Sequence, residues 1–422
     1  MILVENPAAS DTPYYTPSQC PVAGTAVAGR VEAPKLFKPL QIKQLKLQNR
    51  ILYSAKDGHH TDWHFAHLGG IISRGPGMSF VEATAVVAEG RITPEDSGLW
   101  KDSQIAPLRR IVEFAHSQGQ LVGIQLAHAG RKASTYAPYL MSNRGPAKRG
   151  GSTSSCTISL CCSLELTRYL IKGQWVHGWP ENVFAPSARP FKDNSIVPRD
   201  MTQKDIFVLV DAWISAVKRA VIAGFDAGDS LAIEIHAGHG YLLHEFWSPV
   251  SNRRNNSYGG SFENRIRLLL EITRATKANI PSSVPLFVRV SGTDWLEYLK
   301  DEPSWDVPQT IELAKILADE GVDVLDVSSG GNDPRHKIES GPGYQAPFAL
   351  AVKRALGDRL LVATVGSITS GGQANTLLDQ GLDMVMIGRT FLKNPGLVWA
   401  FAEDLKVEAS MPKQIRWAFG SH

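Results

Sequence analysis

Short runs of β-branched and other apolar residues alternate with longer amphipathic stretches along most of the chain, and no other feature restricts the fold as strongly. One helical stretch, with apolar residues at helical spacing, separates each strand-like run from the next. Consecutive strands joined by a single helix are expected to pair in parallel. The expected strands are 80–87, 121–127, 233–236, 286–291, 324–328, 360–365 and 384–387. The expected helices are 105–118, 207–223, 262–279, 307–320, 347–356 and 371–380.

This alternation predicts an α/β fold of the (β/α)₈ TIM barrel type. Runs such as LLVATV and MVMI are apolar on both faces, which is typical of parallel strands buried on both sides. About eight such units in about 360 residues fit a barrel better than an open, doubly wound sheet. The open sheet is the alternative, but no G-x-G-x-x-G motif opens a helix after an early strand.

We expect a single barrel domain over residues 35–422. Residues 1–34 are rich in Pro, Ala, Ser and Thr and have no periodicity, which predicts a disordered N-terminal tail. An irregular insert at about 144–177 interrupts the alternation, because it begins basic and Gly/Ser-rich and then turns apolar without a clear period. It follows a strand, so it could cover the active face of the barrel.

Charge and composition exclude several classes of protein. The 44 basic and 41 acidic side chains nearly cancel, giving a net charge of +3, and no basic stripe indicates a nucleic-acid or membrane partner. No run reaches the roughly 18 apolar residues of a membrane helix, and the N-terminus lacks the pattern of a secretory signal. The four cysteines are too few and too clustered for a disulfide framework, so we expect a reducing, cytoplasmic location. A zinc site at Cys156, Cys161 and Cys162 is a weak alternative, since their spacing is not C-x₂-C.

Barrel enzymes carry their chemistry at the C-terminal ends of the strands, and here those ends are rich in polar residues. His236 and His239 stand three residues apart where one strand ends, so both side chains can face one cavity. Two imidazoles can donate hydrogen bonds to one carbonyl oxygen and polarise it, and Tyr241 can donate a proton. A metal-binding pair is the less favoured alternative, because Glu245 is the only close carboxylate that could add a ligand.

Two glycine turns follow what we count as the seventh and eighth strands, where barrels bind phosphate. Gly366 and Gly388 would let backbone N–H groups approach the anion, and a short helix would add its dipole. Arg389 would contribute a charge-assisted hydrogen bond. Either glycine alone would indicate only a tight turn, but their joint position predicts a phosphate site.

A second group of histidines has the i, i+4, i+7 spacing of one helix face. These residues are His60, His64 and His67, and the segment lacks the glutamate of an H-E-x-x-H motif. Trp63 and Phe65 lie among them, so the pattern favours helix packing with hydrogen-bonded histidines over a metal site.

The run HAGHGYLLHEFWSPVSNRR, followed by YGGSFENR, resembles the Old Yellow Enzyme family of flavin oxidoreductases, especially its short bacterial and fungal NADPH dehydrogenases. Other segments that resemble this family are LFKPLQIKQLKLQNRI, EATAVVAEGRITPEDSGLW, IQLAHAGRKAS, FVRVS, GPGYQ and MIGR. The resemblance extends from about Leu36 to Gly420, except for the insert. It implies a (β/α)₈ barrel that binds FMN, is reduced by NADPH, and reduces the activated C=C bond of α,β-unsaturated carbonyl compounds or of a biosynthetic intermediate.

The resemblance also assigns roles to individual residues. His236 and His239 would bind the carbonyl oxygen of the substrate, and Tyr241 would protonate the α-carbon after hydride transfer from the flavin. Tyr53 would lie beside the substrate, and Arg416 would reach into the pocket of a neighbouring subunit, which implies a homodimer or homotetramer. The residues that would bind FMN are Ala83, Gln125, Arg289, Gly366, Gly388 and Arg389.

The sequence departs from the family pattern at the expected first strand. Asn49-Arg50-Ile51-Leu52 runs almost directly into Tyr53, about six residues short, and each strand residue spans about 3.3 Å. We therefore expect an incomplete first strand and weaker FMN binding, unless 47–52 shifts register to replace it. A flavin-free barrel acting as a binding or scaffold protein is the second functional hypothesis. A metal-dependent hydrolase or an aldolase is a distant third, with Lys132 as the one lysine near a strand end.

Overall fold

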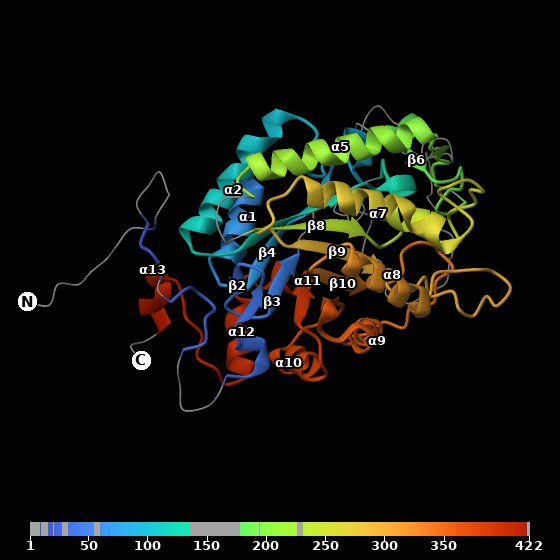
Figure 1. The fold of residues 1–422 in the computed structure, drawn as a ribbon. Helices are drawn as coiled ribbons and strands as arrows, with labels where there is room; N and C mark the ends of the chain where they lie inside the picture. The colour runs from blue at the N-terminus through green and yellow to red at the C-terminus, as the bar shows by residue number, and fades with distance from the viewer. Residues whose placement is uncertain are drawn as a thin grey trace, which may run out of the picture.

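Eight parallel strands form a closed barrel in the computed structural model, which describes residues 9, 16–19, 21–27, 33–54, 60–135, 178–193, 195–225 and 231–419 (Figure 1). The strands are β3 (Ile51–Ser54), β4 (Met78–Ala85), β5 (Val122–Ala127), β8 (Leu231–Ala237), β9 (Leu286–Ser291), β10 (Val324–Ser328), β11 (Leu361–Val365) and β12 (Met384–Ile387). Around the barrel they follow the order β10-β11-β12-β3-β4-β5-β8-β9, each paired in parallel with its neighbours. The predicted (β/α)₈ barrel is therefore confirmed, and the open sheet is excluded.

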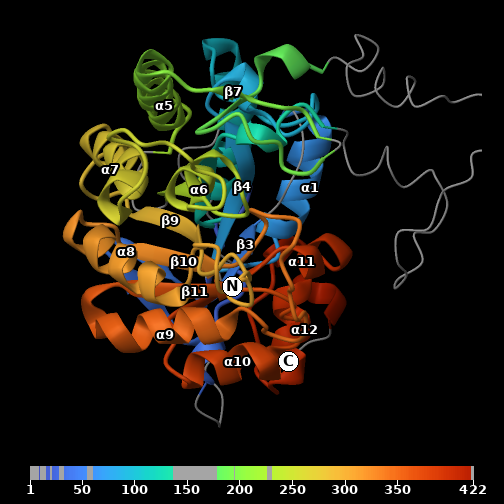
Figure 2. The same ribbon diagram turned by 90° about the vertical axis from the view of Figure 1, so that its right-hand side faces the viewer.

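A ring of helices covers the outside of the barrel, as the view onto its strand ends shows (Figure 2). These helices are α1 (Asp62–Ile72), α2 (Ile105–Ser117), α5 (Gln203–Ile222), α7 (Phe262–Ala278), α8 (Val307–Asp319), α9 (Ala346–Leu356), α10 (Gly371–Asp379) and α12 (Leu397–Asp404). Several of these helices begin after a capping residue, whose side-chain oxygen accepts a hydrogen bond from an otherwise unpaired backbone N–H. The capping residues are Thr202, Ser261, Asp306 and Ser370.

The remaining elements are short. They are β1 (Leu40–Ile42), β2 (Leu45–Leu47), β6 (Phe184–Ala185), β7 (Arg199–Asp200), α6 (Leu242–Trp247), α11 (Arg389–Lys393) and α13 (Lys413–Arg416). Every strand and helix expected from the sequence is found, and the largest displacement is at α5, which begins at Gln203 instead of residue 207. Within the described ranges, no helix is both long and apolar enough to cross a membrane.

The first strand corrects one expectation. Ile51–Ser54 pairs with β12 on one side and with β4 on the other, so the short segment completes the barrel by itself. Tyr53 is level with Ile387 and Ser79 in this pairing. The strand is thus present with four described residues, of which Ile51 and Leu52 belong to the segment 47–52 that was considered as a replacement.

The lower part of the barrel interior is an apolar plug. Phe80 and Phe287 meet edge to face with ring centroids 5.2 Å apart, and the β1–β2 hairpin packs against the same cluster. Other members of this buried cluster are Met78, Val324, Ala363, Met384 and Met386. These buried side chains fill the described interior at this end of the barrel, as is usual for barrels of this type.

Part of the expected N-terminal tail is attached to the barrel. The N–H of Gly24 donates to the carbonyl of Ser410 at 2.9 Å, and the N–H of Val27 donates to that of Glu408 at 2.8 Å. The Asn49 side chain also donates to the Gly24 carbonyl, at 3.1 Å. Much of residues 1–34, all four cysteines and the insert at 144–177 lie outside the described residues.

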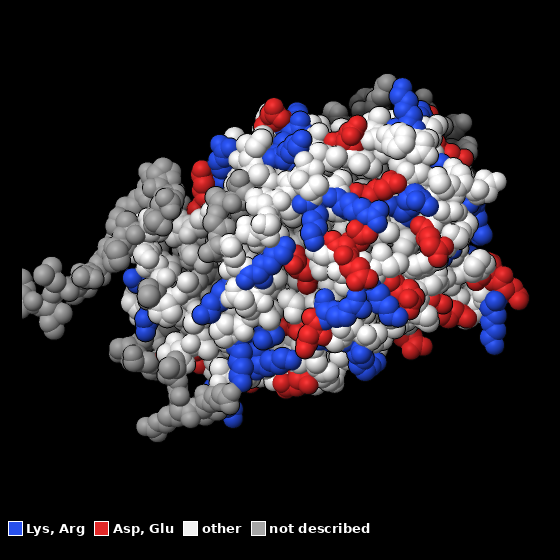
Figure 3. All heavy atoms as spheres, in the orientation of Figure 1, with Lys and Arg blue, Asp and Glu red and all other residues white. Residues whose placement is uncertain are grey.

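Basic and acidic side chains are interspersed on the face drawn in Figure 3, over α5, α7 and α8. Several of them form ion pairs between neighbouring helices, such as Arg274 with Glu320 and Arg359 with Asp319. This face carries no continuous basic stripe, which agrees with the expectation from charge patterning.

Candidate active site

Three aromatic rings converge at the C-terminal end of β8. The ring centroid of His236 lies 5.2 Å from that of His239 and 5.1 Å from that of Tyr241, both nearly perpendicular. His236 and Tyr241 are almost fully buried, at 5% and 8% exposure. The structure thus brings together the two histidines and the tyrosine that the sequence singled out, at the end of the barrel where chemistry is expected.

Hydrogen bonds orient both histidines. The backbone N–H of Gly238 donates to Nδ1 of His236 at 3.2 Å, so neutral His236 carries its proton on Nε2 and can donate from there. His239 has a left-handed backbone, with φ of 56°, and its N–H donates to the Ser291 hydroxyl at 2.8 Å. Its Nε2 lies 2.5 Å from the Ser328 hydroxyl. The ends of β9 and β10 therefore determine where the His239 ring lies.

Buried polar and ionisable side chains form a layer beside these rings. Gln125 donates to Glu234 at 2.5 Å, and Nε of Arg289 lies 3.2 Å from Asp326. Arg289 is level with His236 on one side and with Asp326 on the other. Burial, assisted by the nearby charge of Asp326, raises the pKa of Glu234 to about 8, and burial also raises the pKa of Asp326.

The sequence analysis predicted Gln125 and Arg289 but missed the two acids. The signal was available, because alternate residues of a strand share a face. Glu234 stands two residues before His236, and Asp326 stands two residues before Ser328. An amide, a guanidinium and two carboxyl groups below the mouth of the barrel form a polar floor for a bound ring system that has hydrogen-bonding edges.

Gly366 and Gly388 follow β11 and β12, as predicted for the two glycine turns. Gly366 has φ of 123°, and a Cβ atom there would lie 2.7 Å from the Gln345 amide and 3.0 Å from the Tyr344 ring. Gly388 is the N-cap of α11, whose first residue is Arg389. The N-terminal end of a helix carries partial positive charge, which suits a phosphate. The residues at both turns therefore fit a phosphate group.

Ala83 lines the same region as Tyr241. Both border a small cavity of about 10 Å³ between the ends of β4 and β5, together with Ala127 and Gly90. Small side chains on these two strands leave room beside the tyrosine ring, which larger residues would fill.

Lys132 ties the loop after β5 to the histidine turn. Its Nζ donates to the carbonyl of His239 at 2.7 Å and to the carbonyl of Gly331. The same ammonium lies 5.5 Å from the Tyr241 ring centroid and 4.3 Å from that of Phe191. The charged amine is thus used in hydrogen bonds to backbone carbonyls, which suits positioning and does not suit a Schiff-base nucleophile.

Glu245 does not accompany the histidines as a metal ligand would. Its Oε1 accepts the backbone N–H of Arg131 at 2.9 Å, and its carboxyl group packs against Gly130. Burial raises the pKa of Glu245 to about 8. In the described part of the chain, no group of three or more His, Cys, Asp or Glu side chains is arranged to bind a metal ion.

The remaining histidines of interest lie outside this site. Thr61 is the N-cap of α1, so His60 precedes the helix and does not share its face, contrary to the expectation. His64 packs as expected, because its Nδ1 accepts the N–H of Thr61 at 3.0 Å and its Nε2 lies 3.5 Å from Glu82. His67 stacks on Trp63.

Two predicted substrate residues are not brought to the site within the described structure. The side chain of Tyr53 lies outside the described residues, and its backbone is level with Ser79, four positions before Ala83. Arg416 is exposed in α13, which lies at the opposite end of the molecule from β6 (Figure 1). It borders a surface cavity of about 270 Å³ that Trp399 and Phe419 also line.

Comparison with known proteins places this geometry in a family. A model of the NADH:flavin oxidoreductase / NADH oxidase family matches residues 35–408. The chain is 50% identical to an NADH:flavin oxidoreductase of Gibberella zeae, over 99% of this chain and 96% of that protein. It is 36% identical to an NADPH dehydrogenase of Geobacillus thermodenitrificans, over 91% of this chain and 99% of that protein.

A solved structure has the same fold. The Old Yellow Enzyme homologue from Zymomonas mobilis superposes with a TM-score of 0.65 at 24% identity, covering 90% of this chain and 94% of that one. The family match and the full-length relatives agree, and the solved structure shares the barrel fold. The chain therefore belongs to the NADH:flavin oxidoreductase / NADH oxidase family and is an FMN-dependent oxidoreductase with NADH or NADPH as its reductant.

Proposed function

We propose that this oxidoreductase reduces the activated C=C bond of α,β-unsaturated carbonyl compounds, with NADPH as the preferred reductant. The observation that carries the proposal is the convergence of His236, His239 and Tyr241 at one strand end. Two imidazoles and a phenol, oriented by backbone hydrogen bonds and by Ser328, match what a conjugated carbonyl needs: donors for its oxygen and an acid for its α-carbon.

The side chains divide the work between them. Nε2–H of His236 and the His239 ring bind the carbonyl oxygen, which draws electron density from the double bond and makes the β-carbon electrophilic. Tyr241, whose hydroxyl is a weak acid, delivers a proton to the α-carbon. The near-complete burial of Tyr241 and His236 excludes water that would otherwise compete for these hydrogen bonds. FMN, when bound, supplies the hydride for the β-carbon.

The described residues fit FMN at both of its polar ends. We assign the phosphate to the turns at Gly366 and Gly388, where Arg389 adds positive charge. We assign the ring edge to Gln125 and Arg289, since a cation there stabilises negative charge on a reduced ring. Ala83 would line the ring. Tyr53 beside the substrate remains part of the proposal.

A second subunit is also part of the proposal. Arg416 is exposed and far from the mouth of its own barrel, so it can serve a site only in another copy of the chain. Trp417 beside it is 81% exposed, which is unusual for a tryptophan and suits a surface that another subunit covers. Cross-linking in solution, with Arg416→Ala assayed for a higher KM, tests this assignment.

The first experiment is the visible absorption spectrum of the purified protein. We expect a flavin band, either at once or after FMN is added, that bleaches with NADPH in the absence of oxygen and recovers with an enone. Tyr241→Phe should still bleach with NADPH but should recover far more slowly with the enone. If the band bleaches but none of the conjugated carbonyl compounds tested restores it, the proposed substrate class is contradicted. A protein that does not bind added FMN would favour a binding or scaffold role.

A further inference from the structure

We propose that Asp294 and His244 form a buried acid–histidine pair that positions the turn 238–241 by keeping His244 in one tautomer. This inference deepens the proposed function, because that turn carries His239 and Tyr241. Neither Asp294 nor His244 is among the residues assigned above to substrate or flavin. Both are positioning residues, acting through the backbone of the turn.

The pair is sealed inside the protein. Both side chains are 0% exposed, and Nε2 of His244 lies 3.0 Å from Oδ1 of Asp294. The two atoms are in close contact without the geometry of a hydrogen bond, and neither has a hydrogen-bond partner in the described residues. On the other side of the ring, Nδ1 of His244 accepts the backbone N–H of Gly240 at 2.9 Å. The histidine thus connects a carboxylate to the backbone of the turn.

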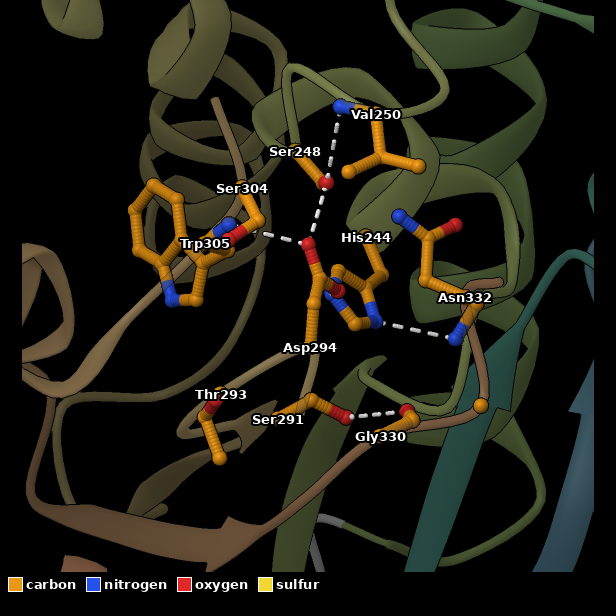
Figure 4. A network of polar contacts seen from close by, with 12 residues as sticks. His244, Ser248, Val250, Ser291, Thr293, Asp294, Ser304, Trp305, Gly330 and Asn332 are labelled. Carbon is orange, nitrogen blue, oxygen red and sulfur yellow. Dashed lines mark hydrogen bonds and ion pairs between the residues drawn. The ribbon is translucent and has the colours of Figure 1, made fainter. Parts of the chain in front are cut away.

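The hydrogen bonds determine where the proton of His244 lies. Nδ1 accepts from Gly240, so in the neutral ring the proton is on Nε2, the nitrogen that lies 3.0 Å from Asp294. The other oxygen of Asp294 accepts the Ser248 hydroxyl at 2.6 Å and the Trp305 N–H at 2.9 Å. Figure 4 shows the carboxylate between these two donors and His244. Every neighbour is a donor, so the position requires a group that only accepts.

The turn needs this support because its backbone is strained. His239 and Gly240 are both left-handed, with φ of 56° and 68°. A residue with a Cβ atom is disfavoured in this region, because the Cβ atom crowds the backbone. A Cβ at Gly240 would lie 2.2 Å from the Gly331 carbonyl, so the turn is also pressed against the loop after β10. If the Gly240 N–H lost its acceptor, a buried donor would be unpaired, and one of the hydrogen bonds that hold the strained backbone in place would be gone.

The consequence for chemistry follows from the order of residues. Gly240 lies between the substrate-binding His239 and the acid Tyr241, whose N–H closes the turn onto the Gly238 carbonyl at 3.1 Å. A shift of the Gly240 peptide moves both rings relative to His236. Hydrogen bonds to a reacting carbonyl lose much of their effect when they are displaced by about 1 Å. The pair therefore acts on substrate binding and on proton delivery together.

Asp294→Asn is the decisive variant. The amide oxygen must face Ser248 and Trp305, because both donate, so the amide NH₂ faces His244. Nε2 must then accept, the proton moves to Nδ1, and Nδ1–H opposes the Gly240 N–H. We expect the FMN content to be unchanged, the KM for an enone to rise about tenfold or more, and the turnover number to fall. Histidine labelled with ¹⁵N should show His244 changing from the Nε2–H to the Nδ1–H tautomer.

Two further variants keep the test decisive if Asp294→Asn folds poorly. Ser248→Ala removes one donor from the same carboxylate without changing the atom that faces His244, so it should keep the tautomer and change KM less than threefold. His244→Asn places an amide oxygen near the position of Nδ1 and should retain most of the binding that His244→Leu loses. The ¹⁵N signal that disappears from the NMR spectrum of His244→Asn also identifies the resonance of His244.

The outcomes separate this inference from the proposed function. A wild-type protein whose His244 carries its proton on Nδ1, or a folded Asp294→Asn with unchanged tautomer and KM, overturns the pair's role. A wild-type protein with the expected tautomer but without enone turnover contradicts the proposed substrate class and leaves the tautomer result in favour of the pair. The NMR measurement needs no substrate, so the two conclusions are tested independently.

Discussion

Glu245 offers a prediction whose magnitude can be worked from the structure. Its carboxyl group accepts the Arg131 N–H at 2.9 Å and packs so closely on Gly130 that a Cβ there would lie 2.2 Å from Oε1. No space for water remains on that side. Burial raises its pKa from 4.5 to about 8, although the charge of Arg131 opposes the rise. The native state therefore holds this group in its neutral form at pH 7.

The sign of the effect follows from proton binding. The folded protein keeps a proton on Glu245 that the unfolded chain releases near pH 4.5, so stability falls as the pH rises between these values. The shift of about 3.5 pH units (8 minus 4.5) corresponds to about 5 kcal/mol, at about 1.4 kcal/mol per unit. This stabilisation is fully present below pH 4.5 and is lost by about pH 8.

Glu245→Gln isolates the effect, because glutamine is neutral at every pH and its amide oxygen can still accept the Arg131 N–H. We would measure the free energy of unfolding in urea for both proteins, at equal FMN loading, from about pH 5 to about pH 9. The free energy of unfolding of the variant minus that of the wild type should rise by about 1.4 kcal/mol per pH unit and level off near pH 8. Other titrating groups cancel in the difference. A difference that stays constant over this range would refute the reasoning.

Three further predictions concern the site. Tyr241→Phe should leave bleaching by NADPH unchanged but lower enone turnover by about 100-fold or more in stopped-flow kinetics; an equal effect on both steps would contradict proton donation. Gly366→Ala should weaken FMN binding and lower the free energy of unfolding by about 2 kcal/mol, because the φ of 123° at Gly366 and the Gln345 amide at 2.7 Å leave no room for a methyl group. Unchanged FMN binding in a fluorescence titration would exclude this turn from the phosphate site. His128→Asn should reduce the loss of stability at acid pH, because burial lowers the pKa of His128 to about 4 and its Nδ1 accepts the Gly130 N–H. The free energy of unfolding of the wild type should fall by about 3 kcal/mol between about pH 6.5 and pH 4, and an equal fall in both proteins would contradict this prediction.

Local pattern was sufficient for most of the fold and for the reacting residues. The strands from 286–291 to 384–387 could be located because each is a short, continuous apolar run, and their helices could be located because apolar residues recur at helical spacing. His236, His239 and Tyr241 follow one strand directly, so their proximity is a property of a few consecutive residues. The glycines at 366 and 388 were recognisable for the same reason.

Tertiary structure decided what depends on register and on contacts between distant segments. Ile51–Ser54 closes the barrel only because β12 and β4 present matching hydrogen bonds, which no local pattern records. Glu234 and Asp326 came to lie in one layer of ionisable side chains through the pairing of neighbouring strands around the barrel. His244 and Asp294 are 50 positions apart (294 minus 244), and their pairing depends on the ends of β8 and β9 lying side by side. Sequence determined which residues lie at the strand ends, because periodicity is local. Packing determined which of those residues meet and in which tautomer, because hydrogen-bond partners are selected across the chain.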